Sequence, residues 1–138
     1  MAEAVFRSLI RGDGRFGQID SAGTQAQEGE KPDPRTMSTL LNNGILDYQH
    51  VSRKVLSSDF IKFDYILGVD NEALRVLRYM YSGDVERLNI MLLGDFGAET
   101  GEEIHDIYHG PEERFEKVYE KMVEFAKGFI AQVLEKNR

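Results

Sequence analysis

The side chains in this sequence that could do chemistry are carboxylates and histidines rather than thiols. The 138 residues include no cysteine and only three histidines, His50, His105 and His109. Without a thiol, the chain itself has no thiolate nucleophile and no cysteine ligand for zinc or an iron–sulfur cluster. The spacing of the histidines matches no zinc motif. The sequence therefore predicts no metal site and no cofactor.

A second pattern that could bind a ligand is the run of glycines from Gly12 to Gly17, which has the form G-x-G-x-x-G. In a dinucleotide-binding site these glycines follow a strand and open a helix. Here they follow a predicted helix and precede a predicted strand. The run is therefore predicted to be a plain turn.

The elements that must position these groups begin with a helix. Apolar residues recur at helical spacing from Met1, and Gly12 is a suitable stop. A short strand is predicted at Phe16–Asp20, followed by a polar loop to Lys31. Asp33 then suits a helix cap with proline directly after it.

The second half of the chain alternates strands and helices. Nearly continuous apolar runs predict buried strands at Phe63–Val69 and Asn89–Leu93. Asp70 is predicted to cap the helix between them, and Pro111 to begin the last helix. Ser57 or Ser58 is expected to cap one short helical turn before the first of these strands. Alternating strands and helices predict an α/β fold with a parallel sheet, in a single domain spanning 1–138.

Charge and hydropathy limit the partners. The net charge of −7 disfavours general binding to nucleic acid or to an anionic membrane, because both need clustered lysine and arginine. No apolar run approaches the ~18 residues of a membrane span, and no signal peptide is evident. We expect a cytoplasmic protein with no nucleic acid or membrane partner.

Short strings in a fixed order resemble the low-molecular-weight protein tyrosine phosphatase family over the whole chain. No single string is decisive, but all of them follow the family's order and spacing. They are MAEAVFR (1–7), IDSAGT (19–24), PDPR (32–35), GI…HVSR (44–53), SSDFIKFDYILGVD (57–70), LLG (92–94), HDIYHG (105–110) and FEKVY (115–119). The resemblance implies a three-layer Rossmann-like fold with a parallel sheet of order 2-1-3-4.

The resemblance also implies a reaction, which is metal-free hydrolysis of phosphotyrosine and aryl phosphates through a cysteinyl-phosphate. Its general acid would be Asp106, and Tyr108 and His109 would flank the substrate ring. The family usually has Asp-Pro-Tyr-Tyr here, whereas this chain has Asp106-Ile107-Tyr108-His109. Losing the proline loosens this loop, and losing the second tyrosine removes part of its aromatic wall.

Four further residues match positions that support the family's phosphate loop. Ser21 and His50 resemble residues that hydrogen-bond this loop, and Glu3 and Asp70 resemble acids that orient its arginine. Without the loop, we expect Ser21 and His50 to be satisfied by water or backbone. Asp70 is expected to remain a helix cap, and Glu3 to be a solvated first-turn glutamate.

The family's first strand and its loop of cysteine, five residues and arginine have no counterpart here, because Met1 falls at the start of the helix that follows them. The missing strand is an interior one, and its loss would leave a gap of roughly 10 Å between its neighbours. The neighbours could pair directly, or a partner or second copy could supply a strand.

We expect this polypeptide to be catalytically inactive, either as an N-terminally incomplete phosphatase or as a pseudophosphatase that binds a protein partner or phosphoprotein. In-frame codons for the cysteine loop upstream of Met1 would distinguish these two readings. Arsenate reductases share the fold but need several redox cysteines, so they fit poorly.

Overall fold

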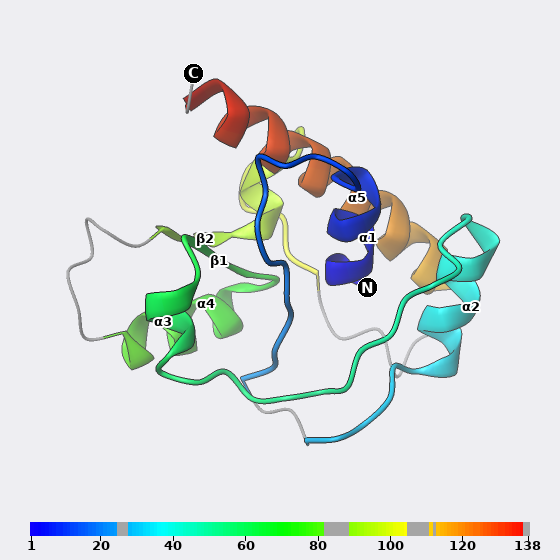
Figure 1. Ribbon diagram of the computed structural model, residues 1–138, viewed down its shortest axis with the longest axis horizontal. Helices are drawn as coiled ribbons and strands as arrows, with labels where there is room; N and C mark the ends of the chain where they lie inside the picture. The colour runs from blue at the N-terminus through cyan, green and yellow to red at the C-terminus, as the bar shows by residue number, and fades with distance from the viewer. Residues whose placement is uncertain (25–27, 82–88, 105–110, 112, 137–138) are drawn as a thin grey trace.

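The computed structural model describes residues 1–24, 28–81, 89–104, 111 and 113–136. In these ranges a parallel pair of strands lies between helices, which is an α/β arrangement (Figure 1). In chain order the elements are α1 (Ala2–Leu9), α2 (Pro34–Asn42), α3 (Asp59–Lys62), β1 (Tyr65–Gly68), α4 (Asn71–Met80), β2 (Asn89–Leu92), the 3-10 helix η1 (Leu93–Phe96) and α5 (Glu113–Lys136).

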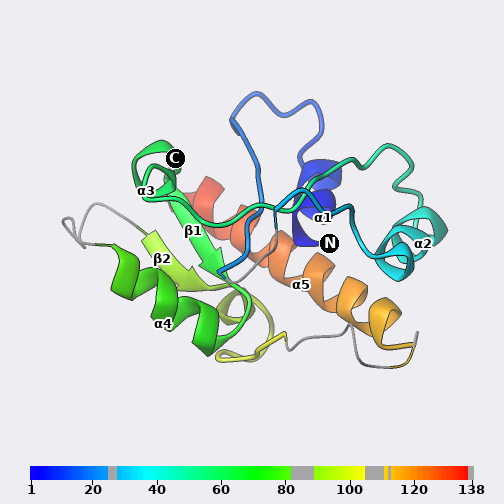
Figure 2. The same cartoon turned by 90° about the horizontal axis from the view of Figure 1, so that it is seen from below.

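The centre of the fold is the unit β1-α4-β2. The strands pair in parallel from Tyr65 opposite Asn89 to Gly68 opposite Leu92, and Figure 2 shows the two strands side by side. The turn between β1 and α4 is tight, because a Cβ on Gly68 would lie 3.1 Å from the backbone nitrogen of Leu74. Both predicted strands and the helix between them are confirmed.

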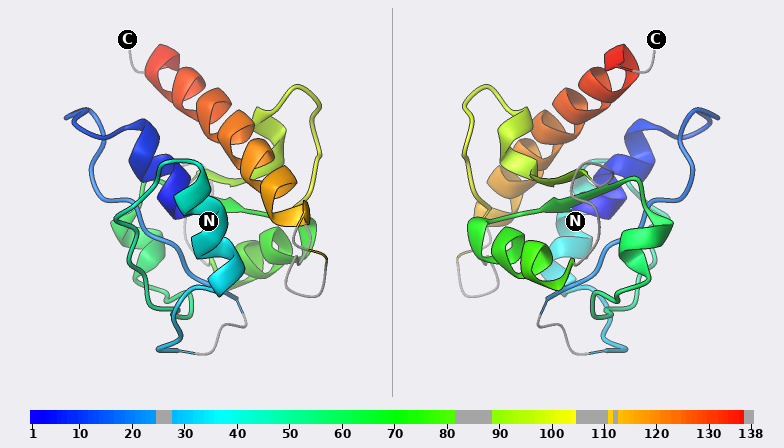
Figure 3. Two further views of the ribbon diagram at one scale, coloured as in Figure 1. Left: turned by 90° about the vertical axis from the view of Figure 1, so that its right-hand side faces the viewer. Right: turned by 90° about the vertical axis from the view of Figure 1, so that its left-hand side faces the viewer.

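Helices cover the strands on two sides. α4 packs against β1 and β2, while α5 lies on the other side and packs against α1, α2 and η1 (Figure 3). α5 places Phe125 and Ala126 in the core with no exposed surface, beside Val5 of α1 and Leu93 of η1. None of the helices in the described ranges is long and apolar enough to cross a membrane.

Phe129 joins four elements around one ring. It meets Phe6 of α1 at 5.7 Å between ring centroids, and Tyr65 of β1 and Phe96 of η1 at 5.2 Å each. All three contacts are edge-on, with interplanar angles of 75°, 86° and 89°. This geometry suits aromatic quadrupoles, so Phe129 of α5 fixes α1 relative to the sheet.

The predicted helix starts at Asp33 and Asp70 are confirmed. Asp33 Oδ1 accepts the Arg35 N–H at 2.8 Å, and Asp70 Oδ1 accepts the Ala73 N–H at 2.7 Å. Each carboxylate satisfies a backbone donor that the first helical turn leaves unpaired. For the short helix α3, Ser58 is the cap residue but its side chain makes no cap hydrogen bond.

The predicted strand at Phe16–Asp20 is wrong. This segment has no strand pairing, and β1 takes its pairing from β2 within the described residues. A strand forms only where a neighbour supplies backbone partners, and no described residue pairs its backbone with this segment. The first backbone pairing comes later, where the Gly23 N–H donates to Arg53 O at 2.9 Å and the Val55 N–H to Gly23 O at 3.1 Å.

The glycine run after α1 is a turn, as predicted. Gly12 has φ +80°, which favours glycine, and Asp13 Oδ1 accepts the Arg15 N–H at 3.0 Å. The run therefore redirects the chain from α1 into the extended segment that leads to Ser21.

Candidate functional site

The site is organised around Glu3 in the first turn of α1. Its residue is only 2% exposed, so the expectation of a solvated glutamate is wrong. Ser21 Oγ donates to Glu3 Oε1 at 2.8 Å, and His50 Nδ1 lies 3.1 Å from the same oxygen. Three segments distant in the sequence therefore meet at one buried carboxylate.

Ser21 and His50 have side-chain partners, whereas the sequence predicts that water or backbone satisfies them. They contact each other, with Ser21 Oγ 3.4 Å from His50 Nε2, and both contact Glu3. The His50 ring also stacks on Tyr48 with an interplanar angle of 9° and a centroid distance of 6.2 Å. The bridge between Gly23 and Lys54 brings the two segments together.

An ion-pair chain extends the cluster away from Glu3. Arg53 Nε donates to Asp20 Oδ2 at 3.1 Å, and the same guanidinium donates both terminal nitrogens to Asp59 at 2.9 and 3.1 Å. Burial alone would raise the pKa of Asp59, but hydrogen bonds from Arg53 and the Leu56 N–H outweigh it and lower this pKa. Arg53 thus holds the extended segment to the start of α3.

Asp20 lies between Arg53 and the Glu3 cluster. Its Oδ1 accepts the backbone N–H of Ser21 at 2.8 Å. Burial acts to raise the pKa of Asp20, while that N–H and the charge of Arg53 lower it, and the net direction is downward. Asp20 is therefore stabilised as a carboxylate next to Glu3.

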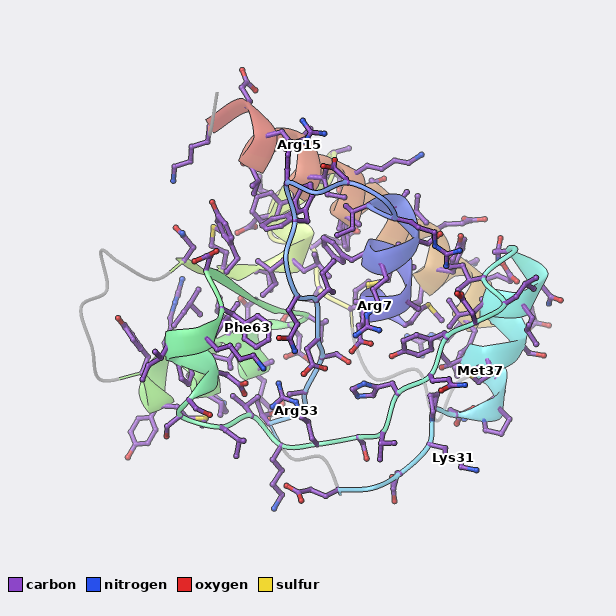
Figure 4. All side chains as sticks on the ribbon, viewed as in Figure 1. Arg7, Arg15, Lys31, Met37, Arg53 and Phe63 are labelled. Carbon is purple, nitrogen blue, oxygen red and sulfur yellow. The ribbon has the colours of Figure 1, made fainter. Side chains whose placement is uncertain are left out.

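Arg7 closes the other side of the cluster. It donates to Ile19 O at 2.8 Å, and the same nitrogen is 3.3 Å from Glu3 Oε2. Figure 4 shows Arg7 reaching from α1 and Arg53 from the loop before α3, and both bind the extended segment between them. Beside this cluster, burial and then the Glu3 carboxylate raise the pKa of Tyr48 to about 12.

The remaining predicted site residues are not brought into this cluster by the described structure. Asp70 caps α4, just beyond the carboxyl end of β1. Asp106, Tyr108 and His109 lie outside the described residues. Their predicted roles as general acid and substrate-ring contacts stay predictions.

Sequence reasoning missed Asp20, Arg53 and Asp59 as members of the network. Each lies next to or within a string that carries the family resemblance, namely IDSAGT, HVSR and SSDF. Their position in or beside these strings was the available signal. Local periodicity could not have connected Asp20 with Arg53, because they are 33 positions apart in the sequence.

A shallow groove of about 570 Å³ lies elsewhere, between the end of α1 and the segment that follows. Its lining runs from Arg7 to Ile19 and includes the glycine turn. Glu3, Ser21 and His50 do not line it. The groove is therefore separate from the Glu3 cluster, apart from the shared Arg7.

Comparison with known proteins identifies the family. The family model described as low molecular weight phosphotyrosine protein phosphatase matches residues 1–138. The chain belongs to this family. A Schizosaccharomyces pombe low molecular weight phosphotyrosine protein phosphatase is 38% identical over 139 residues, covering 96% of this chain and 87% of the relative. The Homo sapiens relative of the same description is 36% identical, covering 94% of this chain and 84% of its own length.

Solved structures agree with the family assignment. A protein tyrosine phosphatase from Entamoeba histolytica with Hepes in its active site superposes with a TM-score of 0.88 at 30% identity, covering 99% of this chain and 89% of that one. The crystal structure of Primo-1 gives a TM-score of 0.85 at 32% identity, with 96% and 88% coverage. The Rossmann-like α/β fold of the low-molecular-weight phosphatases is thereby confirmed.

The Glu3 cluster is suited to positioning rather than to nucleophilic attack. Ser21 Oγ donates to the Glu3 carboxylate, while the Ser21 backbone N–H donates to the Asp20 carboxylate. A phosphate monoester dianion is repelled by two adjacent carboxylates. In this low-molecular-weight phosphatase family member, the cluster instead binds α1, the extended segment and the His50 loop into one rigid support.

Proposed function

We propose that this 138-residue chain is a phosphotyrosine phosphatase family protein that does not itself hydrolyse phosphate monoesters. The observation that carries the proposal is the absence of cysteine from its sequence. The family resemblance implies a reaction through a cysteinyl-phosphate, and a thiolate is the group that attacks phosphorus in such a reaction. Asp106 would then be a general acid with no attack to assist.

An assay with p-nitrophenyl phosphate tests this proposal. The purified chain is expected to release no nitrophenol above the blank rate. Asp106→Ala and Ser21→Ala are assayed beside it. Turnover that disappears in Asp106→Ala would contradict the proposal, and loss in Ser21→Ala as well would point to a serine nucleophile.

A second candidate function is binding of a phosphoprotein without turnover. Two observations favour it. Ser21 and His50 both contact Glu3, whereas the acid loop departs from the family's Asp-Pro-Tyr-Tyr at Ile107 and His109. Residues that support the family's phosphate loop are kept while the acid loop is altered, and this combination favours binding over catalysis.

Titration with a phosphotyrosine peptide tests this second candidate. Saturable binding that the unphosphorylated peptide does not show would support it. The absence of saturable binding would exclude recognition of phosphotyrosine. It would leave unaffected the proposal that the chain does not hydrolyse phosphate monoesters.

We also infer that β1 accepts a strand from a partner or from a second copy. Within the described residues its backbone pairs with β2 alone, and a free strand edge is a template for pairing. If a second copy supplies the strand, sedimentation equilibrium should show association of copies. If a partner supplies it, the partner strand should slow amide exchange along Tyr65–Gly68. A monomer whose β1 amides no partner protects would contradict the inference.

A further inference from the structure

Asn43 joins the end of α2 to α5 through its side-chain amide. The amide nitrogen Nδ2 donates to Thr39 O at 2.8 Å, within α2. It also donates across to α5, where the two carboxylate oxygens of Glu116 lie at 3.2 and 3.4 Å. The backbone closes the same helix end, because the Gly44 N–H donates to Leu41 O at 3.1 Å. A neutral amide at this position therefore supports both the end of α2 and its contact with α5.

The residue that follows makes this amide chemically reactive. Of the asparagines in the sequence, Asn43 alone is followed by glycine. Gly44 has φ +85°, and a Cβ added to it would meet no atom within 4 Å, so there is room around its nitrogen for a ring to form. An unhindered backbone nitrogen attacks the side-chain carbonyl carbon of a preceding asparagine and forms a cyclic imide. We propose that Asn43 is the deamidation site of this chain and that its conversion releases α2 from α5.

The reaction needs water as its only other reactant. The Gly44 nitrogen forms a bond to Cγ of Asn43 while the bond from Cγ to Nδ2 breaks. Nδ2 leaves as ammonia, with the proton that the glycine nitrogen gives up. Water then opens the imide. Attack at the side-chain carbonyl carbon gives an aspartate, and attack at the backbone carbonyl carbon gives an isoaspartate.

Both products replace a hydrogen-bond donor with a negative charge. The Glu116 carboxylate, which accepts from Nδ2 in the intact chain, then faces a second carboxylate, and like charges this close repel each other. Thr39 O loses its side-chain donor. A negative charge is also unfavourable at the C-terminal end of a helix, where the last carbonyl groups are unpaired. All three effects weaken the joint between α2 and α5.

The turn at Asn43 also leads into the loop that carries Tyr48 and His50. The Ile45 N–H donates to Leu40 O at 2.9 Å, and both residues pack with Tyr48 in one buried cluster. An isoaspartate adds one carbon to the backbone of this turn and displaces the Ile45 N–H from Leu40 O. Conversion of Asn43 therefore loosens the support of Tyr48, and with it the His50 ring that stacks on Tyr48.

Incubation of the purified chain at mildly alkaline pH, followed by peptide mapping with mass spectrometry, tests whether Asn43 converts. Asn43 is expected to convert before Asn42, Asn71 and Asn89. The folded chain should react more slowly than the urea-unfolded chain, but by less than about 10-fold, because the end of a helix opens readily. In nitrogen-15 spectra of the folded chain, the side-chain amide signals of Asn43 should disappear while those of Asn42 remain.

Variants that mimic the product test the release of α2. Asn43→Asp is expected to lower the urea midpoint by about 1 M, because a hydrogen bond to a charged group is replaced by repulsion. Asn42→Asp is the matched control, since it adds the same charge at an exposed position of the same helix end; its loss should be less than half as large. Adding Glu116→Gln to Asn43→Asp should recover most of the difference, because the repulsion is removed.

The converted but otherwise unaltered chain should show the same lowered midpoint as Asn43→Asp, which makes the result independent of how the variants fold. An Asn43 that stays intact in the folded chain for about ten times the period that completes conversion in urea would overturn the proposal. Earlier conversion of another asparagine would also overturn it. So would equal midpoints for Asn43→Asp and Asn42→Asp, or a converted chain as stable as the intact one.

Discussion

Phe129 is the position where one substitution most directly tests how α1, and with it Glu3, is held on the fold. The side chain is 7% exposed and meets three aromatic rings edge-on at 5.2 to 5.7 Å. A buried phenylalanine truncated to alanine costs ~3–5 kcal/mol. Each edge-on pair contributes ~0.5–1.5 kcal/mol beyond buried area. We expect Phe129→Ala to lower the free energy of unfolding by about 4 kcal/mol, in the middle of the range for truncation.

Urea denaturation followed by circular dichroism measures this change. With a slope of ~1.5 kcal/mol per molar urea, a loss of about 4 kcal/mol moves the midpoint down by roughly 2.5 M. Phe129→Leu keeps most of the volume and removes the ring, so its loss is expected to stay below about 2 kcal/mol. Tyr79→Ala removes an aromatic that is 91% exposed, and its effect is expected within about 0.5 kcal/mol.

The comparison among these variants can refute the reasoning. Equal midpoints for Phe129→Ala and Phe129→Leu would mean that the alanine variant creates no cavity around this position. A loss in Phe129→Ala no larger than that in Tyr79→Ala would mean that the ring cluster does not hold α1 and the sheet together.

Three further predictions concern single contacts. Because the pKa of Asp59 is lowered in the folded chain, its stabilisation is present above the unfolded pKa of ~3.9 and is lost as the pH falls through the folded value. Urea midpoints measured from neutral to acidic pH should therefore fall less steeply in Asp59→Asn than in the unaltered chain, and parallel profiles would count against the Arg53 contact. Asp33→Ala removes a helix cap and should cost ~0.5–2 kcal/mol by the same measurement; a change of under a few tenths would show that the cap bond is not made in solution. Gly128→Ala places a methyl group against the backbone oxygen of Phe96. Because α5 and η1 must then separate, the melting temperature should fall. A melting temperature equal to that of the unaltered chain would contradict this close approach.

Much of the fold follows from local sequence signals. Asp33 and Asp70 cap helices as their residue types predict, and the apolar runs around Tyr65 and Ile90 form the two strands. These elements were predictable because caps and apolar periodicity act over a few residues. The strand at Phe16–Asp20 failed because its formation depends on a neighbouring strand, which local sequence does not supply.

The candidate site was less accessible to the same reasoning. Glu3 lies in a first helical turn, where an acid is favoured by the helix dipole and is usually solvated. Its burial comes instead from Ser21 and His50, which are 18 and 47 positions away in the sequence. The family resemblance singled out all three residues, but not that they bind one another.

The ion pairs of Arg53 join the extended segment to α3 where backbone pairing is sparse. β1 and β2 are held by a continuous ladder of peptide hydrogen bonds. In the described part of the neighbouring region, backbone pairing consists of the bridge at Gly23 and Lys54 and the hydrogen bonds of Ser52 with Gly29 and Glu30. Charges at a partly exposed site weaken as dissolved ions shorten the screening length. Rising ionic strength should therefore weaken the contacts of Arg53 with Asp20 and Asp59 before it affects the β1-α4-β2 unit.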